Sequence, residues 1–96
     1  QQPTWEVIMT KHDAIRISQL HQIFPEVQLT ERQKDIAVMY VIGCTVEGIA
    51  SEKGITTDGV MYHLNLVKRA VGSATLVGVR TTAFLRMMAI LLTRES

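Results

Sequence analysis

The segment TTDGVMYHLNLVKR contains side chains that could recognise nucleic acid. Asn65 can bind adenine through two hydrogen bonds, and Met61 and the ring of Tyr62 can contact thymine methyl groups. Lys68 and Arg69 can bind phosphates and so fix the register of a helix on the duplex. A simpler interpretation of the same face is a solvated helix surface that carries two exposed apolar side chains.

The sequence gives little support for other chemistry. The three histidines are scattered and Cys44 lies far from them, so no metal site is predicted, and His63 is expected to bind a phosphate or a backbone group. Cys44, the single cysteine, excludes an internal disulfide and fits a reducing compartment. We expect it to be a small core residue rather than a redox sensor, since no neighbouring cation in the sequence would activate its thiol. No glycine-rich phosphate loop, carboxylate pair or nucleophile constellation is present, so we expect neither enzyme activity nor a cofactor.

Length and composition indicate one small globular domain. The chain has 96 residues, of which 47% are apolar and 20% charged. A net charge of +1 is nearly balanced, so any affinity for a polyanion must come from a local patch. No apolar run approaches the roughly 18 residues of a membrane span, and no signal peptide is visible. We therefore expect a cytoplasmic, nucleoid-associated domain without membrane contact. Because the first residue is not methionine, we also expect the chain to be a fragment of a longer regulator.

Two short helices can be predicted from their capping residues. Thr30 followed by Gln33 is a capping box that begins the first helix, and Gly43 can end it in a left-handed conformation. Thr45 caps the second helix, which Gly54 closes.

A third, longer helix follows, capped by Thr56 or Thr57 and stopped by Gly72. Its apolar residues recur at helical spacing and are expected to face the core: Val60, Leu64, Val67 and Val71. Three helices of these lengths, separated by short turns, predict a helix-turn-helix unit, and no βαβ alternation is present. The predicted fold class is all-α.

The two ends of the chain are harder to interpret. Thr4 to Phe24 has mostly helical apolar spacing, and Pro25 predicts a break, so we place a linker at about residues 24–28. Residues 1–28 therefore form a separate helical or linker segment in our prediction, and residues 29–96 form the domain. The first segment, which includes Trp5, either leads to a missing sensor domain or packs back on the three helices, and we favour packing.

A last helix is expected from Thr81 to about Leu92. Thr75 is a competing cap, but it would place Gly78 inside the helix at a cost of ~1 kcal/mol. The helix is apolar nearly all round, so a small domain cannot cover it fully. The side chains expected to meet a partner copy are Phe84, Leu85, Met88, Leu91 and Leu92.

The 44 residues from Leu29 to Gly72 resemble the LuxR-type (GerE-like) helix-turn-helix of bacterial transcription regulators. The matching positions are Leu29, Thr30, Arg32, Gly43, Ile49, Ala50, Ile55, Val60, His63 and Gly72. The sequence GVRTTAFL, from Gly78, is similar to the start of the family's fourth helix, which commonly forms the dimer contact. This chain departs from the family where it has Gln33 for glutamate and Gly59 for threonine, and where Glu47, Met61 and Leu64 replace lysine or arginine.

The resemblance implies a bundle of about four helices over about residues 29–92, preceded by an extra N-terminal helix or linker segment. It also implies sequence-specific binding of promoter or operator DNA with the third helix in the major groove, as a homodimer that can also contact RNA polymerase or another regulator. The residues assigned to DNA are Thr45, Thr57, Asp58, Met61, Tyr62, His63, Asn65, Lys68 and Arg69. Two alternatives remain open: a helix-turn-helix kept as a protein-interaction module that modulates another regulator, and a monomer whose first segment covers the last helix.

Overall fold

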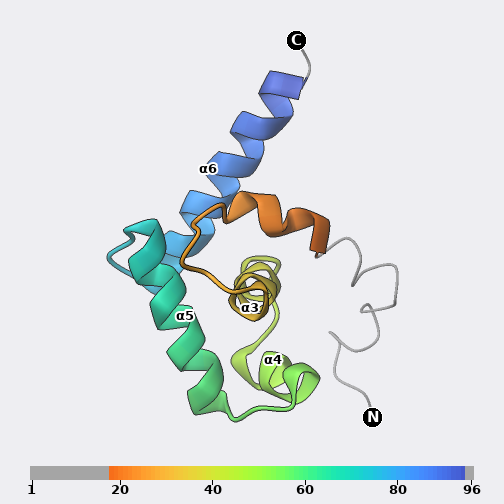
Figure 1. Cartoon of the computed structure of the whole chain (residues 1–96), viewed down its shortest axis with the longest axis vertical. Helices are drawn as coiled ribbons and strands as arrows, with labels where there is room; N and C mark the ends of the chain where they lie inside the picture. Colours follow the sequence, from red (N-terminus) through yellow and green to blue (C-terminus); the bar gives the residue numbers. More distant parts are fainter. Residues whose placement is uncertain (1–17, 95–96) are drawn as a thin grey trace.

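The computed structural model describes residues 18–94, with side chains to residue 93. Within this range the chain forms one short 3-10 helix and four α-helices, and no strand. They are η1 (Leu20–Ile23), α3 (Glu31–Val41), α4 (Val46–Lys53), α5 (Thr57–Val71) and α6 (Leu76–Arg94). In Figure 1, α3 lies at the centre of the bundle, with α4, α5, α6 and η1 around it. The prediction of an all-α fold of about four helices is confirmed.

Capping side chains begin the first three α-helices as predicted. Thr30 Oγ1 accepts a hydrogen bond from the Gln33 amide at 3.1 Å, and Gln33 Oε1 accepts one from the Thr30 amide at 3.0 Å. The hydroxyls of Thr45 and Thr56 each accept from the amide three residues later, both at 3.0 Å. Thr56, and not Thr57, therefore caps α5.

The C-terminal ends of α4 and α5 are equally well specified. Both helices end at a glycine in the left-handed conformation, Gly54 with φ 65° and Gly72 with φ 76°. Arg32 of α3 donates through Nη2 to the carbonyl oxygen of Lys53 at 2.9 Å, which satisfies one of the free carbonyls at the end of α4. This bond ties the exit of α4 to the start of the central helix.

Every element contributes to a single buried core. Three of the four predicted stripe residues of α5 are fully buried, whereas Val71 is half-buried. The N-terminal segment takes part as well, because Ile23 and Phe24 are 2% and 0% exposed. Within the predicted Thr4–Phe24 helix the structure shows η1 at Leu20–Ile23, and the part before residue 18, with Trp5, lies outside the described residues. The main core side chains are Ile23, Phe24, Leu29, Ile36, Ala37, Val38, Met39, Cys44, Ile49, Val60, Leu64, Val67, Val79 and Ala83.

Our prediction for the start of the last helix was wrong. α6 begins at Leu76 and not after Thr81, and Thr75 Oγ1 accepts a hydrogen bond from the Gly78 amide at 3.0 Å. The hydroxyl of Ser73 donates to the Thr75 carbonyl at 2.8 Å, and it occupies the space that a Cβ on residue 78 would need. Glycine at this position therefore makes room for the turn that starts α6, a role that helix propensity alone does not capture.

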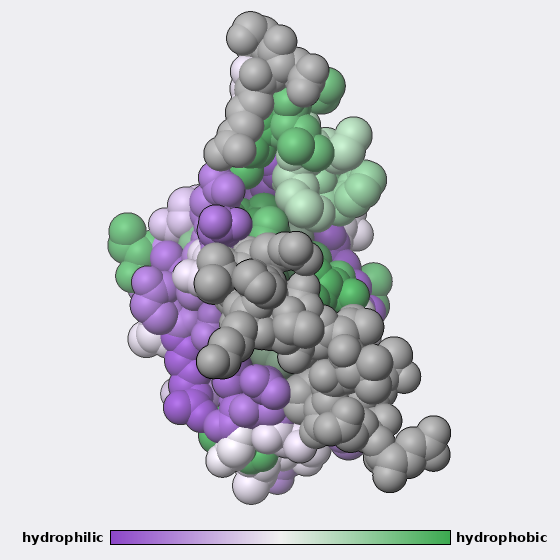
Figure 2. Space-filling model, turned by 90° about the vertical axis from the view of Figure 1, so that its right-hand side faces the viewer, coloured by the Kyte–Doolittle hydropathy of each residue, from purple (hydrophilic) through white to green (hydrophobic). Residues whose placement is uncertain are grey.

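α6 extends beyond the rest of the bundle (Figure 1). Its inner side packs through Val79 and Ala83, while five outward residues are 42–67% exposed. We call these the exposed stripe of α6: Phe84, Leu85, Met88, Leu91 and Leu92. In Figure 2 apolar side chains gather on the upper part of the molecule, where α6 projects.

The length of α6 also corrects our statement that no apolar run approaches a membrane span. The window Leu76–Thr93 has a mean hydropathy of 1.5 over 18 residues, so by length and composition alone α6 could cross a membrane. Only 11% of that window is buried, which distinguishes it from an ordinary core helix. Our prediction considered only the short apolar block from Ala83 to Leu92, which contains Arg86. The longer window contains two cations, Arg80 and Arg86, and is still apolar on average.

Candidate nucleic-acid interface

The turn between α4 and α5 fixes the orientation of α5. The Ile55 amide donates to the Ala50 carbonyl at 3.0 Å, and the Ile55 side chain packs against the core. Val60 and Leu64 of α5 are fully buried, so the helix packs along one side on α3 and α4. The opposite side of α5 is therefore the outer face of a helix-turn-helix unit.

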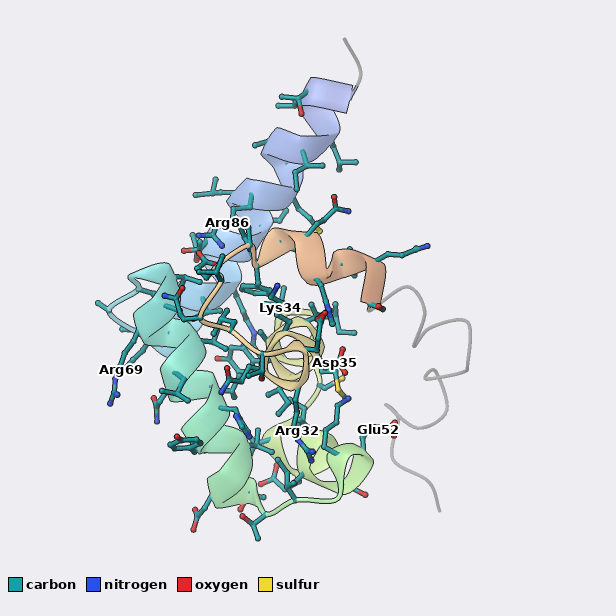
Figure 3. All side chains as sticks on the ribbon, viewed as in Figure 1. Arg32, Lys34, Asp35, Glu52, Arg69 and Arg86 are labelled. Carbon is teal, nitrogen blue, oxygen red and sulfur yellow. The ribbon has the colours of Figure 1, made fainter. Side chains whose placement is uncertain are left out.

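The outer face of α5 carries most of the residues that we assigned to DNA. Asp58 and Thr57 are exposed in the first turn, Tyr62 is 62% exposed, and Asn65 is half-buried. Arg69 is exposed and projects from α5 away from the other helices (Figure 3). This face thus offers hydrogen-bonding, aromatic and cationic groups within one helix.

Two of the assigned residues fit the face less well. Met61 is half-buried and packs against the edge of the core, so only part of its side chain can reach a ligand. Thr45 is exposed but begins α4, and its hydroxyl already accepts the capping hydrogen bond. The hydroxyl of Thr45 can still donate to a phosphate, because a hydroxyl has one donor as well as two lone pairs.

The free positive charge of the described chain is concentrated at the end of α5. The side chains of Lys68 and Arg69, and that of Lys34 in α3, have no hydrogen bond or ion pair within residues 18–93. The other lysines and arginines with described side chains have partners: Arg32 binds the Lys53 carbonyl, Lys53 binds Asp35, Arg80 binds the Tyr40 carbonyl and ring, and Arg86 binds Glu26. Cations that already have partners contribute less to binding an external phosphate.

In the described part of the chain, unpaired negative charge lies in the first turn of α5 and on α4. Asp58 is in the first turn of α5, and Glu47 and Glu52 of α4 are also exposed, all three without an ion pair among the described residues. The carboxylate of Asp58 suits the positive end of the helix dipole but repels an incoming phosphate. α5 is therefore acidic in its first turn and basic in its last.

A shallow groove borders the C-terminal half of α5. Its volume is about 350 Å³, and its lining combines α5 with the chain that leads into α3. The lining residues are Gln28, Leu29, Thr30, Gln33, Leu66, Arg69 and Ala70. Spacing along the chain predicted the outward positions on α5 but not this groove, because the segment around Gln28 packs there only through the tertiary fold.

Gln33 and His63 form a contact that the sequence did not reveal. Gln33 Nε2 lies 3.3 Å from His63 Nδ1, so a side chain from α3 binds the histidine that we expected to bind a phosphate or backbone group. The Tyr62 ring meets the His63 ring edge-on, with 5.4 Å between centroids. His63 is thus held between the central helix and the outer face.

A second cluster of charged groups anchors η1 to the bundle. His21 lies 2.9 Å from Glu31 and 2.5 Å from Asp35, and Asp35 accepts a hydrogen bond from Lys53 at 2.8 Å. Burial alone would raise the pKa of Asp35, but the hydrogen bonds and charges of Lys53 and His21 outweigh it and lower that pKa. No group of three metal-ligating side chains with suitable geometry occurs in the described range.

Cys44 is 6% exposed in the core. Desolvation raises the pKa of its thiol, and the nearby charge of Glu52 raises it further. The structure therefore favours the core role that we expected over the role of a redox sensor, which needs an activated thiolate.

No protein-family model, curated protein or solved structure matches this chain. The similarity to LuxR-type domains therefore remains a resemblance that depends on the residues between Leu29 and Gly72.

Proposed function

We propose that this domain binds promoter DNA as part of a bacterial cytoplasmic transcription regulator, with α5 in the major groove. The observation that supports this proposal is the outer face of α5, where Asn65 and Arg69 lie opposite the buried stripe and the half-buried Lys68 lies on the flank. An amide at the centre of the face suits an adenine edge, and cations beside it suit phosphates.

The distribution of charge limits the strength of this interaction. Each neutralised phosphate contributes about 0.9 to the slope of log affinity against log salt concentration. With Lys68 and Arg69 as the free cations of α5, we expect a slope of about two for one domain. We expect one such domain to bind DNA weakly, and a pair of domains to bind with higher affinity.

We propose further that the exposed stripe of α6 is a dimer contact. Burying each of its large side chains fully would contribute about 1.5–3 kcal/mol. A two-fold contact is the commonest way for identical chains to cover such a surface, and it would place two α5 helices about one DNA turn apart.

Contacts of two arginines support a dimer over a membrane span for α6. Arg80 Nε donates to the Tyr40 carbonyl at 3.2 Å, and Arg86 Nη2 donates to Glu26 Oε2 at 2.6 Å. Inserting α6 into a bilayer would break both contacts and leave two cations in hydrocarbon, which is costly. The alternative is a monomer in which the first segment, Trp5 to Phe24, covers the last helix. The described end of that segment contacts α6, since Arg86 donates to the Ile23 carbonyl, whereas residues 1–17 lie outside the described range.

A second candidate function is a protein-interaction module that binds another regulator or RNA polymerase. The observation in its favour is exposed negative charge on the helix-turn-helix unit, from Asp58 in the first turn of α5 and from Glu47 and Glu52 on α4. A basic protein surface would be attracted by these carboxylates, whereas a DNA backbone would be repelled.

Fluorescence anisotropy at low salt separates the two candidates. A pool of random duplexes gives the non-specific affinity, and selection from that pool gives a preferred sequence. We expect micromolar or tighter binding of the selected duplex, weakened in the double variant Lys68→Ala with Arg69→Ala. Flat titrations up to high micromolar protein would exclude the DNA proposal and leave the protein-interaction module.

A further inference from the structure

The contact between Gln33 and His63 determines which nitrogen of the histidine carries a proton. The Thr30 backbone amide can only donate, and it lies 3.0 Å from one terminal atom of the Gln33 side chain. That atom must therefore be the amide oxygen, and the other terminal atom must be the NH₂ group. The orientation of the Gln33 amide is thus fixed by the capping box of α3.

The fixed amide then selects the tautomer of His63. The Gln33 NH₂ group has no lone pair to offer, so His63 Nδ1, 3.3 Å away, must accept its hydrogen bond. A nitrogen that accepts carries no proton, and the single proton of the neutral ring lies on Nε2.

His63 Nε2 is also accessible at the surface. His63 is half-buried, and its only polar contact among the described residues is with Gln33. No buried side-chain nitrogen or oxygen in that range lacks a hydrogen-bond partner. Because Nε2 lacks a partner within the described range, it cannot be buried, and its N–H is available to an external acceptor.

We infer that Gln33 is a positioning residue which holds His63 as a neutral Nε2–H donor for a DNA phosphate oxygen. The DNA part of this inference rests on the proposed function, whereas the tautomer does not. A phosphate suits His63 better than a base, since His63 lies between the buried stripe and the centre of the outer face. The contact is uncharged, so it adds affinity without releasing a counterion.

Long-range proton–nitrogen correlation spectra of the full chain test the tautomer without DNA. In neutral to mildly alkaline buffer we expect His63 to show a protonated Nε2 and a bare Nδ1, with the signals assigned from the spectrum of His63→Gln. A protonated Nδ1, or the averaged signals of two exchanging tautomers, would overturn the inference.

The variant Gln33→Glu tests the role of the amide while preserving the capping box. A carboxylate can still accept from the Thr30 amide, and it offers an acceptor instead of a donor to His63 Nδ1. We expect the Nδ1 signal to change from bare to protonated. An unchanged His63 spectrum in a folded Gln33→Glu variant would show that the amide does not set the tautomer.

DNA titrations at several salt concentrations test the contact itself. His63→Leu, which removes the donor, should weaken binding about three- to tenfold and leave the salt slope unchanged, whereas Lys68→Ala should lower the slope by about 0.9. A similar drop in the slope for His63→Leu would show that the ring acts as a cation. Full affinity of His63→Leu would show that the ring makes no contact with DNA. If the wild-type chain binds no DNA at all, the proposed function fails and the spectra still decide the tautomer.

Discussion

Asn65, Lys68 and Arg69 lie close together on α5 but should affect DNA binding in different ways. Asn65→Ala should cost ~1–3 kcal/mol on the preferred sequence and relax the preference at one base position. Lys68→Ala and Arg69→Ala should weaken all sequences alike and flatten the salt dependence, because they remove phosphate contacts. Competition titrations with single-base variants of the selected duplex measure both effects. Equal losses on selected and random DNA for Asn65→Ala would contradict its role as a base reader.

Asp35 should make stability depend on pH in the acidic range. Its pKa in the folded state lies below the ordinary value of 3.8, so the ionised form stabilises the fold. This contribution is fully present above about pH 4 and is lost as the pH falls through the lowered folded pKa. Asp35→Asn should therefore destabilise the domain by about 1 kcal/mol near neutral pH. The difference from wild type should shrink below pH 3.8.

Urea unfolding at a series of pH values measures the effect of Asp35→Asn. Glu47→Gln is a matched control, since Glu47 is exposed and has no ion pair among the described residues. The contrary result is a free energy of unfolding of Asp35→Asn that differs from that of wild type by the same amount at neutral and at strongly acidic pH. That result would show that ionisation of Asp35 does not stabilise the fold.

At the scale of elements, the turn before α6 predicts an unusual response to Gly→Ala. An alanine inside a helix is normally more stable than glycine by ~1 kcal/mol. Here the Cβ of Gly78→Ala would overlap Ser73 Oγ, which donates to the Thr75 carbonyl. We expect Gly78→Ala to destabilise the wild-type domain but to stabilise the variant Ser73→Ala, where the hydroxyl is absent.

A double-mutant cycle in urea gives the coupling between Ser73 and Gly78, which we expect to be about 1 kcal/mol. The Cβ of Ser73 lies 3.5 Å from the position that the new methyl group would take, so the double variant has no clash with residue 73. If Gly78→Ala stabilises both backgrounds equally, Ser73 does not determine the need for glycine at this position.

The sequence predicted elements best where local rules are sufficient. Thr30, Thr45 and Thr56 satisfy amides only three residues away, so their positions alone indicated where helices begin. The start of α6 was missed because the propensity scale assigns glycine a cost and does not include its neighbour Ser73. A local rule fails where a nearby side chain needs the same space.

The candidate site could be predicted only in part for a related reason. The outward positions of α5 follow from helical periodicity, which placed Tyr62 and Arg69 correctly on the exposed side. Gln33 and His63 are 30 residues apart, and their contact depends on how α3 packs against α5. The sequence therefore identified the outer face of α5 but did not show that Gln33 contacts and orients His63.

At the scale of the whole molecule, the exposed stripe of α6 should determine association. Leu85→Glu with Leu92→Glu changes two side chains that are 62% and 67% exposed, so the fold should survive. We expect a folded monomer that binds a two-site duplex more weakly, because the second α5 is no longer held beside the first. Val27→Glu is a matched control, since Val27 is 96% exposed and lies outside α6.

Analytical ultracentrifugation at tens of micromolar measures the association, with circular dichroism as the check on folding. A wild-type chain that sediments as a monomer, at the same rate as the double variant, would contradict the dimer. Flotation of the wild-type chain with lipid vesicles, lost in the double variant, would instead assign the stripe to a membrane surface.

The hydrogen bonds of Arg86 to the segment before α3 affect the order in which the chain can fold during synthesis. Arg86 donates to the Ile23 carbonyl at 2.9 Å and to Glu26, residues that leave the ribosome long before α6 is made. Until α6 emerges, Ile23 and Phe24 lack part of the surface against which they pack. The first described segment therefore reaches its final packing only after α6 has been synthesised and has left the ribosome.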